Sequence, residues 1–161
     1  NRDEASNIIF EARYSDSTNQ SKDEMLSEHI DKILQVLQNL PMTFSGTLDW
    51  LIRQSGMTVE ALSEAAEIDT KTIYRLRKKE SQDVKIETVV QLCIGMQLDP
   101  MLSEYLLKAS GKSFMATLQH QMYNYLLRVC YKYSIYECNE MLVNQGLKML
   151  SRKNRGNGEI I

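Results

Sequence analysis

Proline, glycine and long hydrophobic runs are all scarce in this sequence. Two prolines and seven glycines interrupt 161 residues that are rich in Leu, Met, Lys, Glu and Gln. Because proline and glycine disfavour helix interiors more than any other residue, their scarcity predicts an all-α protein. No stretch alternates between apolar and polar residues as a strand would. No apolar run is long enough to cross a membrane and no secretory signal is recognisable, so we expect no membrane association.

Cysteine and histidine are also few, and they form no recognisable site. The three cysteines, Cys93, Cys130 and Cys138, lie in helical patterns without a CxxC pair, as expected for buried, reduced thiols in a cytoplasmic protein. The two histidines, His29 and His120, are far apart and lie in no zinc-binding motif. Phosphate-binding glycine loops and the GxSxG motif of hydrolases are missing as well. We therefore predict no metal, no cofactor, no catalytic residue and no enzymatic activity.

The sequence has no excess of positive charge either, because it contains 19 basic and 21 acidic residues and its net charge is −2. A chain with this balance can bind nucleic acid only through a local basic patch, since its overall field does not attract phosphate. One stretch contains such a patch. It extends from Gly56 to Glu80 and has the sequence GMTVEALSEAAEIDTKTIYRLRKKE.

The first half of this stretch has the pattern of a short amphipathic helix. Thr58 can cap its N-terminus by accepting a hydrogen bond from a free backbone N–H group. Apolar residues then recur at helical spacing, at Val59, Leu62, Ala65 and Ala66. Ile68 follows as a lone apolar residue between two acidic ones, which indicates a turn.

The second half predicts a helix over about residues 70–79 with an apolar inner side and a basic outer side. Asp69 or Thr70 can cap this helix, and Ile73 and Leu76 face inward. At about 100° per residue, the outer arc holds Lys71, Arg75, Lys78 and Lys79, with Tyr74 at its edge. A helix of this kind can rest on a protein core and enter the major groove of DNA.

At these residues the stretch resembles the helix-turn-helix of the lambda-repressor-like, or Xre, family of DNA-binding regulators. The matching residues are Thr58, Glu60 and Leu62 in the first helix, Ile68 in the turn, and Thr72-Ile73-Tyr74-Arg75-Leu76 in the second helix. The resemblance extends from about Phe44 to Leu107 and implies a five-helix, lambda-repressor-like DNA-binding domain.

The stretch departs from the family pattern at three places. Val59 stands where the family usually has a Gln that braces a phosphate or a base. Glu67 stands where the family usually has a Gly in a left-handed conformation, which costs Glu about 1 kcal/mol more than Gly. Arg77, Lys78 and Lys79 continue the basic run where the family often has Glu followed by Gly.

Composition and periodicity divide the rest of the chain into flanking segments. Residues 1–20 are polar and predict a flexible arm, whereas residues 43–111 make up the helix-turn-helix domain. Residues 21–41 predict an N-terminal amphipathic helix, which either pairs with a second copy of the chain or packs on the helical body. Its apolar residues have heptad spacing, at Leu26, Ile30, Ile33, Leu37 and Leu40.

Residues 112–150 predict a C-terminal helical extension, and residues 151–161 a frayed basic tail. The extension is rich in tyrosine, at Tyr123, Tyr125, Tyr131, Tyr133 and Tyr136. Clustered tyrosines suit an interface with a second copy or a protein partner, although they can equally complete an internal core. The basic residues of the tail either touch phosphate or are solvated; with Lys148 before it, they are Arg152, Lys153 and Arg155.

From the resemblance and the basic arc we expect a cytoplasmic, sequence-specific transcriptional regulator that binds double-stranded DNA as a homodimer. The predicted DNA-binding residues are Thr58, Thr70, Lys71, Thr72, Tyr74, Arg75, Lys78 and Lys79. Among them Lys71, Thr72 and Arg75 are expected to face base edges. The alternative is a protein-interaction module on the same scaffold, such as an antitoxin-like or anti-repressor component, which Val59 and the acidic composition favour.

Overall fold

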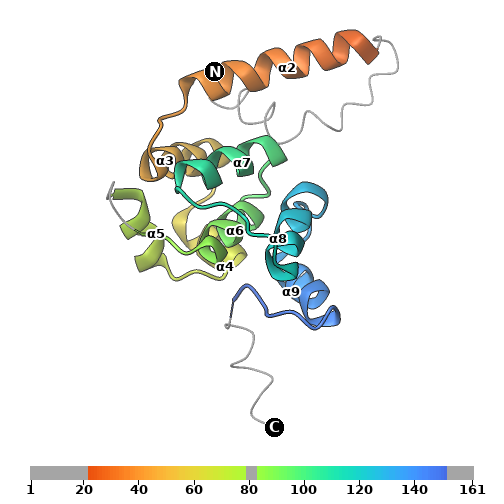
Figure 1. The fold of residues 1–161 in the computed structure, drawn as a ribbon. Coiled ribbons are helices and arrows are strands. Elements are labelled where there is room, and N and C mark those ends of the chain that lie inside the picture. Colours follow the sequence, from red (N-terminus) through yellow and green to blue (C-terminus); the bar gives the residue numbers. More distant parts are fainter. Residues whose placement is uncertain (1–21, 79–82, 152–161) are drawn as a thin grey trace.

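The computed structural model describes residues 22–78 and 83–151, and the regular elements within these ranges are all helices (Figure 1). The predicted all-α class is therefore confirmed. The helices are α2 (Lys22–Asn39), α3 (Phe44–Ser55), α4 (Val59–Ala66), α5 (Thr70–Lys78), α6 (Ile86–Gly95), α7 (Pro100–Ala109), α8 (Leu118–Val129) and α9 (Ile135–Asn144). The predicted arm of residues 1–20, Lys79, and the predicted tail beyond Ser151 lie outside the described residues.

Short polar side chains cap the N-termini of α4, α7 and α9. The Thr58 hydroxyl accepts a hydrogen bond from the Ala61 N–H group at 3.0 Å and so caps α4. Asp99 caps α7. Pro100 is the first residue of this helix, where proline fits well because the backbone N–H group that it lacks would have no partner within the helix. Ser134 caps α9 through its hydroxyl group, as Thr58 caps α4.

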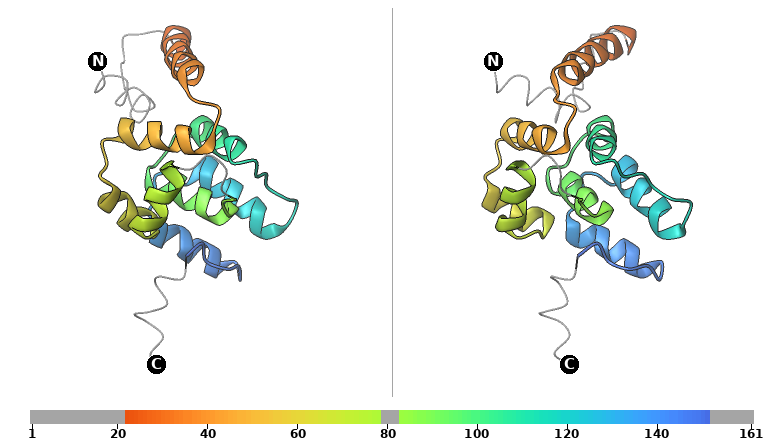
Figure 2. Two further views of the ribbon diagram at one scale, coloured as in Figure 1. Left: turned by 90° about the vertical axis from the view of Figure 1, so that its left-hand side faces the viewer. Right: turned by 60° about the vertical axis from the view of Figure 1, so that its left-hand side comes forward.

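Helices α3 to α7 pack around a shared core in which α4 and α6 lie against each other (Figure 2). The side chains of Leu48, Leu62 and Leu102 are completely buried there. Gly95 lets α6 approach α4 closely, because a Cβ atom at this position would lie 2.7 Å from the Ala66 Cβ atom. The helix-turn-helix therefore packs on α6 with the backbones of α4 and α6 in close contact.

The same core continues into α8 and α9, which contact α6 on the side away from α5 (Figure 1). Tyr123 and Leu126 of α8 and Cys138 and Leu142 of α9 are buried in it. Part of the tyrosine-rich extension therefore completes an internal core. Three of its tyrosines, Tyr125, Tyr133 and Tyr136, are exposed instead.

Helix α2 stands apart from the other helices, above α3 and α7 in Figure 1. Of its five predicted heptad residues, Leu26 and Ile30 are exposed, Leu37 is half-buried, and Ile33 and Leu40 are buried. Among the described helices none combines the length and the apolar character that crossing a bilayer would need.

Candidate nucleic-acid interface

Helix α4 buries an apolar face and exposes an acidic one. Val59 and Leu62 are buried in the core at 6% and 0% exposure, as the spacing predicts. Glu60 and Glu64 lie on the opposite, exposed side of the helix. The first helix of the motif therefore presents negative charge to solvent. Thr58, just before its first residue, is also exposed and carries a neutral hydroxyl group.

The turn after α4 is closed by Glu67 in the left-handed conformation, with φ 54° and ψ 45°. This is the position where the family usually has glycine, and the non-glycine residue adopts the strained conformation. The Ser63 hydroxyl donates a hydrogen bond to the Ile68 carbonyl at 2.5 Å, and Ile68 is buried. Gln91 of α6, itself buried, donates from Nε2 to the Ala66 carbonyl at 3.0 Å. Contacts from within α4 and from α6 therefore hold the turn in place.

Asp69 caps the second helix of the motif, which settles the choice between Asp69 and Thr70. Its Oδ1 atom accepts from the Thr72 N–H group at 2.7 Å, and its Oδ2 atom accepts from the Thr72 hydroxyl at 2.9 Å. Both hydrogen bonds lower the pKa of the Asp69 carboxyl below its usual value, and the bond from the Thr72 backbone has the larger effect. The Thr72 hydroxyl hydrogen is therefore already donated within the protein.

Helix α5 brings four of the predicted DNA-binding side chains together on one exposed face. Ile73 and Leu76 point into the core at 0% and 2% exposure. The exposed residues are Lys71, Tyr74, Arg75 and Lys78. Thr70 and Thr72, near the N-terminus of the helix, are half-buried.

Within this face, the Lys78 ammonium lies over the Tyr74 ring, 5.8 Å from its centroid. At this distance the cation and the ring attract each other, which favours a side-by-side arrangement of the two residues.

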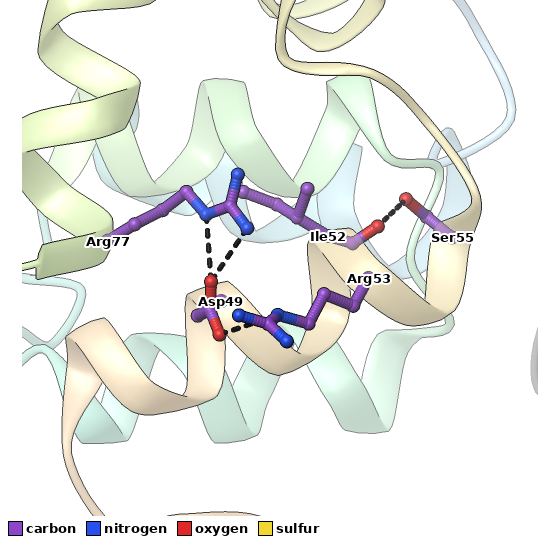
Figure 3. A network of polar contacts seen from close by, with 5 residues as sticks. All are labelled: Asp49, Ile52, Arg53, Ser55 and Arg77. Carbon is purple, nitrogen blue, oxygen red and sulfur yellow. Dashed lines mark hydrogen bonds and ion pairs between the residues drawn. The ribbon is translucent and has the colours of Figure 1, made fainter.

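Arg77 has a different position from the other basic residues of α5 (Figure 3). Its Nε and Nη2 atoms both donate to Asp49 Oδ1 of α3, at 2.9 and 2.7 Å. Arg53 forms an ion pair with the other carboxylate oxygen at 2.9 Å. Arg77 therefore ties α5 to α3 and positions the exposed face, rather than belonging to it.

Three residues that position the motif carry no recognisable signal in the sequence, namely Asp49, Gln91 and Ser151. Ser151 donates a hydrogen bond from its hydroxyl to the Glu67 carboxylate. Each of the three contacts a partner far away along the chain, so no local spacing could indicate the pairing. For Asp49, the sequence offers only the local pairing with Arg53, four residues further along α3.

The described residues contain no cluster of three or more His, Cys, Asp or Glu side chains that could hold a metal ion. The three cysteines are buried and unpaired with one another. Burial raises the pKa of the Cys93 and Cys138 thiols to about 12, so both are held in the unreactive protonated form. The basic face of α5 thus remains the best-developed candidate site on the described part of the chain.

Comparison with models of protein families matches residues 47–100 to the Cro/C1-type HTH DNA-binding domain. The match covers about a third of the chain, from α3 to the first residue of α7, and contains α4, the turn and α5. Comparisons with curated proteins and with solved structures gave no match. The predicted resemblance is confirmed for this segment: residues 47–100 match the Cro/C1-type HTH DNA-binding domain, which is a helix-turn-helix of the lambda-repressor-like kind.

Proposed function

We propose that this protein is a sequence-specific transcriptional regulator that inserts α5 into the major groove of double-stranded DNA. The observation that carries the proposal is the exposed basic row of Lys71, Arg75 and Lys78 on a helix whose opposite side is buried in the domain. Such a helix can enter the groove without unfolding any part of the core.

The side chains of α5 suit different contacts with DNA. Arg75, at the middle of the exposed row, suits two parallel hydrogen bonds to guanine, and Lys71 suits a neighbouring base edge. Thr72 has donated its hydroxyl hydrogen to Asp69, so it offers DNA its methyl group and the oxygen lone pairs. Lys78 at the C-terminal end suits a phosphate contact, as does Thr58 at the start of α4.

The contacts around α5 support this use because they fix its orientation. Arg77 holds the C-terminal end of the helix against α3, and Asp69 caps its N-terminal end. Side chains that contact base edges need a rigid support, since a small displacement breaks a two-bond contact.

We further propose that the protein acts as a homodimer in the cytoplasm. One short helix contacts too few base pairs to specify a site, so regulators of this type bind paired half-sites. The described chain offers exposed apolar residues for self-association on α8, at Leu118, Tyr125 and Val129.

The same exposed face of α8 supports the second candidate function, a protein-interaction module on a helix-turn-helix scaffold. This reading is favoured by the acidic exposed side of α4, where Glu60 and Glu64 would lie near phosphate in a DNA complex. Electrostatic repulsion there restricts how the domain can dock on DNA.

A gel-shift assay at two salt concentrations separates the two functions. We expect the wild-type protein to bind and shift a duplex from its own promoter region. Binding should be weaker at the higher salt concentration, because phosphate contacts release counterions from the DNA and added salt opposes this release. A pull-down that recovers a protein partner, together with no DNA binding at low salt, would favour the interaction module instead.

A further inference from the structure

A surface cavity of about 380 Å³ lies between α7, the segment that follows it and α8. Its volume falls within the range of small-molecule sites in proteins, which is about 300–1,000 Å³. Its lining contains no residue of α4 or α5. The cavity is therefore separate from the DNA contact proposed for α5, and what it binds does not depend on that function.

The walls of this cavity are largely apolar. Leu107 of α7 and Leu127 of α8 line it and are almost completely buried. The half-buried Phe114, between the two helices, adds an aromatic ring to the wall. This ring meets the His120 ring at a steep angle, with 6.1 Å between the ring centroids, so a neighbouring side chain supports it. Such walls suit the hydrocarbon part of a ligand, because apolar surface is stabilised when it leaves water.

The charges around the cavity do not balance. Its lining contains three basic residues, Lys108, Lys112 and Arg128. Lys108 forms an ion pair with Glu104 at 3.4 Å, and Lys112 forms one with Asp83 at 2.7 Å. Arg128 has no carboxylate partner among the described residues. One positive charge at the cavity is therefore left without a negative partner.

The Arg128 side chain is oriented by Asn124, which lies one turn earlier on α8. The Nε–H group of Arg128 donates to Asn124 Oδ1 at 3.1 Å. Within the described part of the chain the two Nη groups of Arg128 have no acceptor. A guanidinium group can donate two parallel hydrogen bonds to one carboxylate, which makes this pair stronger than a neutral hydrogen bond.

Ser103 of α7 also borders the cavity and is almost completely buried. Its hydroxyl oxygen forms no hydrogen bond to a nitrogen or oxygen atom of the described residues. Its polar neighbour is the thiol of Cys93, which is only a weak hydrogen-bonding group. Because buried hydroxyl groups normally have a full hydrogen-bond partner, Ser103 is suited to a polar atom of a ligand.

We propose that this cavity binds a small organic carboxylate with an aromatic ring. The ring packs against Leu107, Phe114 and Leu127, and the carboxylate accepts hydrogen bonds from Arg128. A ligand with a single negative charge matches the one positive charge that lacks a partner. A hydroxyl group on the ring gives Ser103 the partner that the protein does not supply.

The first test compares three probes that share one ring and chain but differ in charge. They are cinnamate, the neutral cinnamamide and the cationic cinnamylammonium, each titrated into the protein by calorimetry without DNA. We expect cinnamate to bind at least about tenfold more tightly than the other two, because only cinnamate pairs with the Arg128 guanidinium. Equal affinities for the three probes, or no binding of cinnamate at millimolar concentration, would overturn the proposal.

Two variants of exposed or half-buried residues test the carboxylate contact without disturbing the core. Arg128→Gln removes the positive charge, and Asn124→Asp supplies a competing carboxylate beside it. Each should weaken cinnamate binding about tenfold or more. The matched control is Arg53→Gln on α3, which removes an exposed arginine away from the cavity and should keep the wild-type affinity. Unchanged cinnamate affinity in Arg128→Gln would show that the carboxylate binds elsewhere.

Ser103→Ala tests the buried hydroxyl group at nearly constant side-chain volume. Wild type should prefer para-hydroxycinnamate to cinnamate by about two- to tenfold, as one added hydrogen bond implies, and Ser103→Ala should bind the two probes alike. The same preference in both proteins would show that Ser103 does not contact the ligand.

The amide NMR spectrum locates the bound probe. We expect cinnamate to shift the signals of residues 101–114 and 124–128, while those of α4 and α5 stay in place. Shifts centred on another part of the chain would contradict the proposed site. Since no DNA is present, this inference can fail while α5 still binds DNA, and DNA binding can fail while the cavity still binds its ligand.

Discussion

Helices α5 and α8 each bury one side in the core, but different kinds of side chain predominate on their outer sides. Ile73 and Leu76 of α5, like Leu126 of α8, are almost fully buried. On the outside, α5 presents Lys and Arg, whereas α8 presents Leu118, Tyr125 and Val129 at 50–66% exposure. The buried sides therefore show only that both helices belong to the core. The exposed sides indicate what kind of partner each helix can bind. A charged row suits phosphate and base edges, and an apolar row suits another protein surface.

The largest expected effect comes from α6, which contacts α8 directly and also contacts α4, the helix on which α5 packs. Gly95→Ala places a Cβ atom 2.7 Å from the Ala66 Cβ atom and should lower the free energy of unfolding by about 1–3 kcal/mol. Urea unfolding followed by circular dichroism measures this change. Adding Ala66→Gly to the variant should restore part of the loss. A Gly95→Ala protein with wild-type stability would show that α4 and α6 are not in close contact.

The next effect concerns the Asp49–Arg77 contact, which ties α5 to α3. Asp49→Ala leaves the largely buried Arg77 without its carboxylate and should cost about 1–3 kcal/mol of unfolding free energy. Arg53→Ala removes the other partner of the same carboxylate and should cost at most about 1 kcal/mol, because Arg53 is 58% exposed. Equal costs for the two variants would mean that Arg77 does not position α5.

A smaller effect is expected at the cap of α5. Asp69→Ala should cost about 0.5–2 kcal/mol of stability, and Asp69→Asn less, because the amide oxygen can still accept from Thr72. The pKa of Asp69 is lowered in the folded protein, so its carboxylate stabilises the fold fully above its unfolded value of 3.8. This contribution is lost as the pH falls through the lower folded value. Acid unfolding of wild type and Asp69→Asn in parallel tests the sign, and identical acid profiles would contradict it.

The smallest effect on stability is expected on the outer side of α8. Tyr125→Glu changes an exposed side chain and should shift the free energy of unfolding by no more than about 0.5 kcal/mol. If α8 is the dimer surface, the same change should make the protein monomeric in sedimentation experiments, because it places a charge in an apolar interface. Tyr131→Glu, at a half-buried position outside the helix, serves as a comparison. An unchanged dimer in the Tyr125→Glu protein would place the interface elsewhere.

The two helices also show how far sequence alone could predict this molecule. The cap at Thr58 and the inward residues Ile73 and Leu76 follow from contacts within a few positions, and the structure has them as expected. For the second helix the sequence offers Asp69 or Thr70 as the cap, and the structure selects Asp69. The exposed face of α5 follows from the same periodicity. Local patterns can therefore place a helix and its faces.

What the sequence could not indicate are the contacts between distant segments. Arg77 continues the basic run in the sequence, but its pairing with Asp49 of α3 could not be foreseen from that run. Gln91 and Ser151 hold the turn from positions 24 and 84 residues away from Glu67. Because such pairs depend on how whole helices pack, no spacing rule predicts them. The identity of the bases contacted depends on the docked geometry in the same way.

The most direct test of the proposal that α5 recognises DNA sequence is to measure how Arg75→Ala changes base recognition. Wild-type protein first selects its preferred duplex from a randomised library, and affinities are then measured for that duplex and for a scrambled one. We expect Arg75→Ala to lose about 1–3 kcal/mol on the selected duplex and much less on the scrambled one. The control Arg128→Ala, on α8, should bind both duplexes as wild type does. Wild-type affinity of Arg75→Ala for both duplexes would contradict the proposal that α5 recognises DNA sequence.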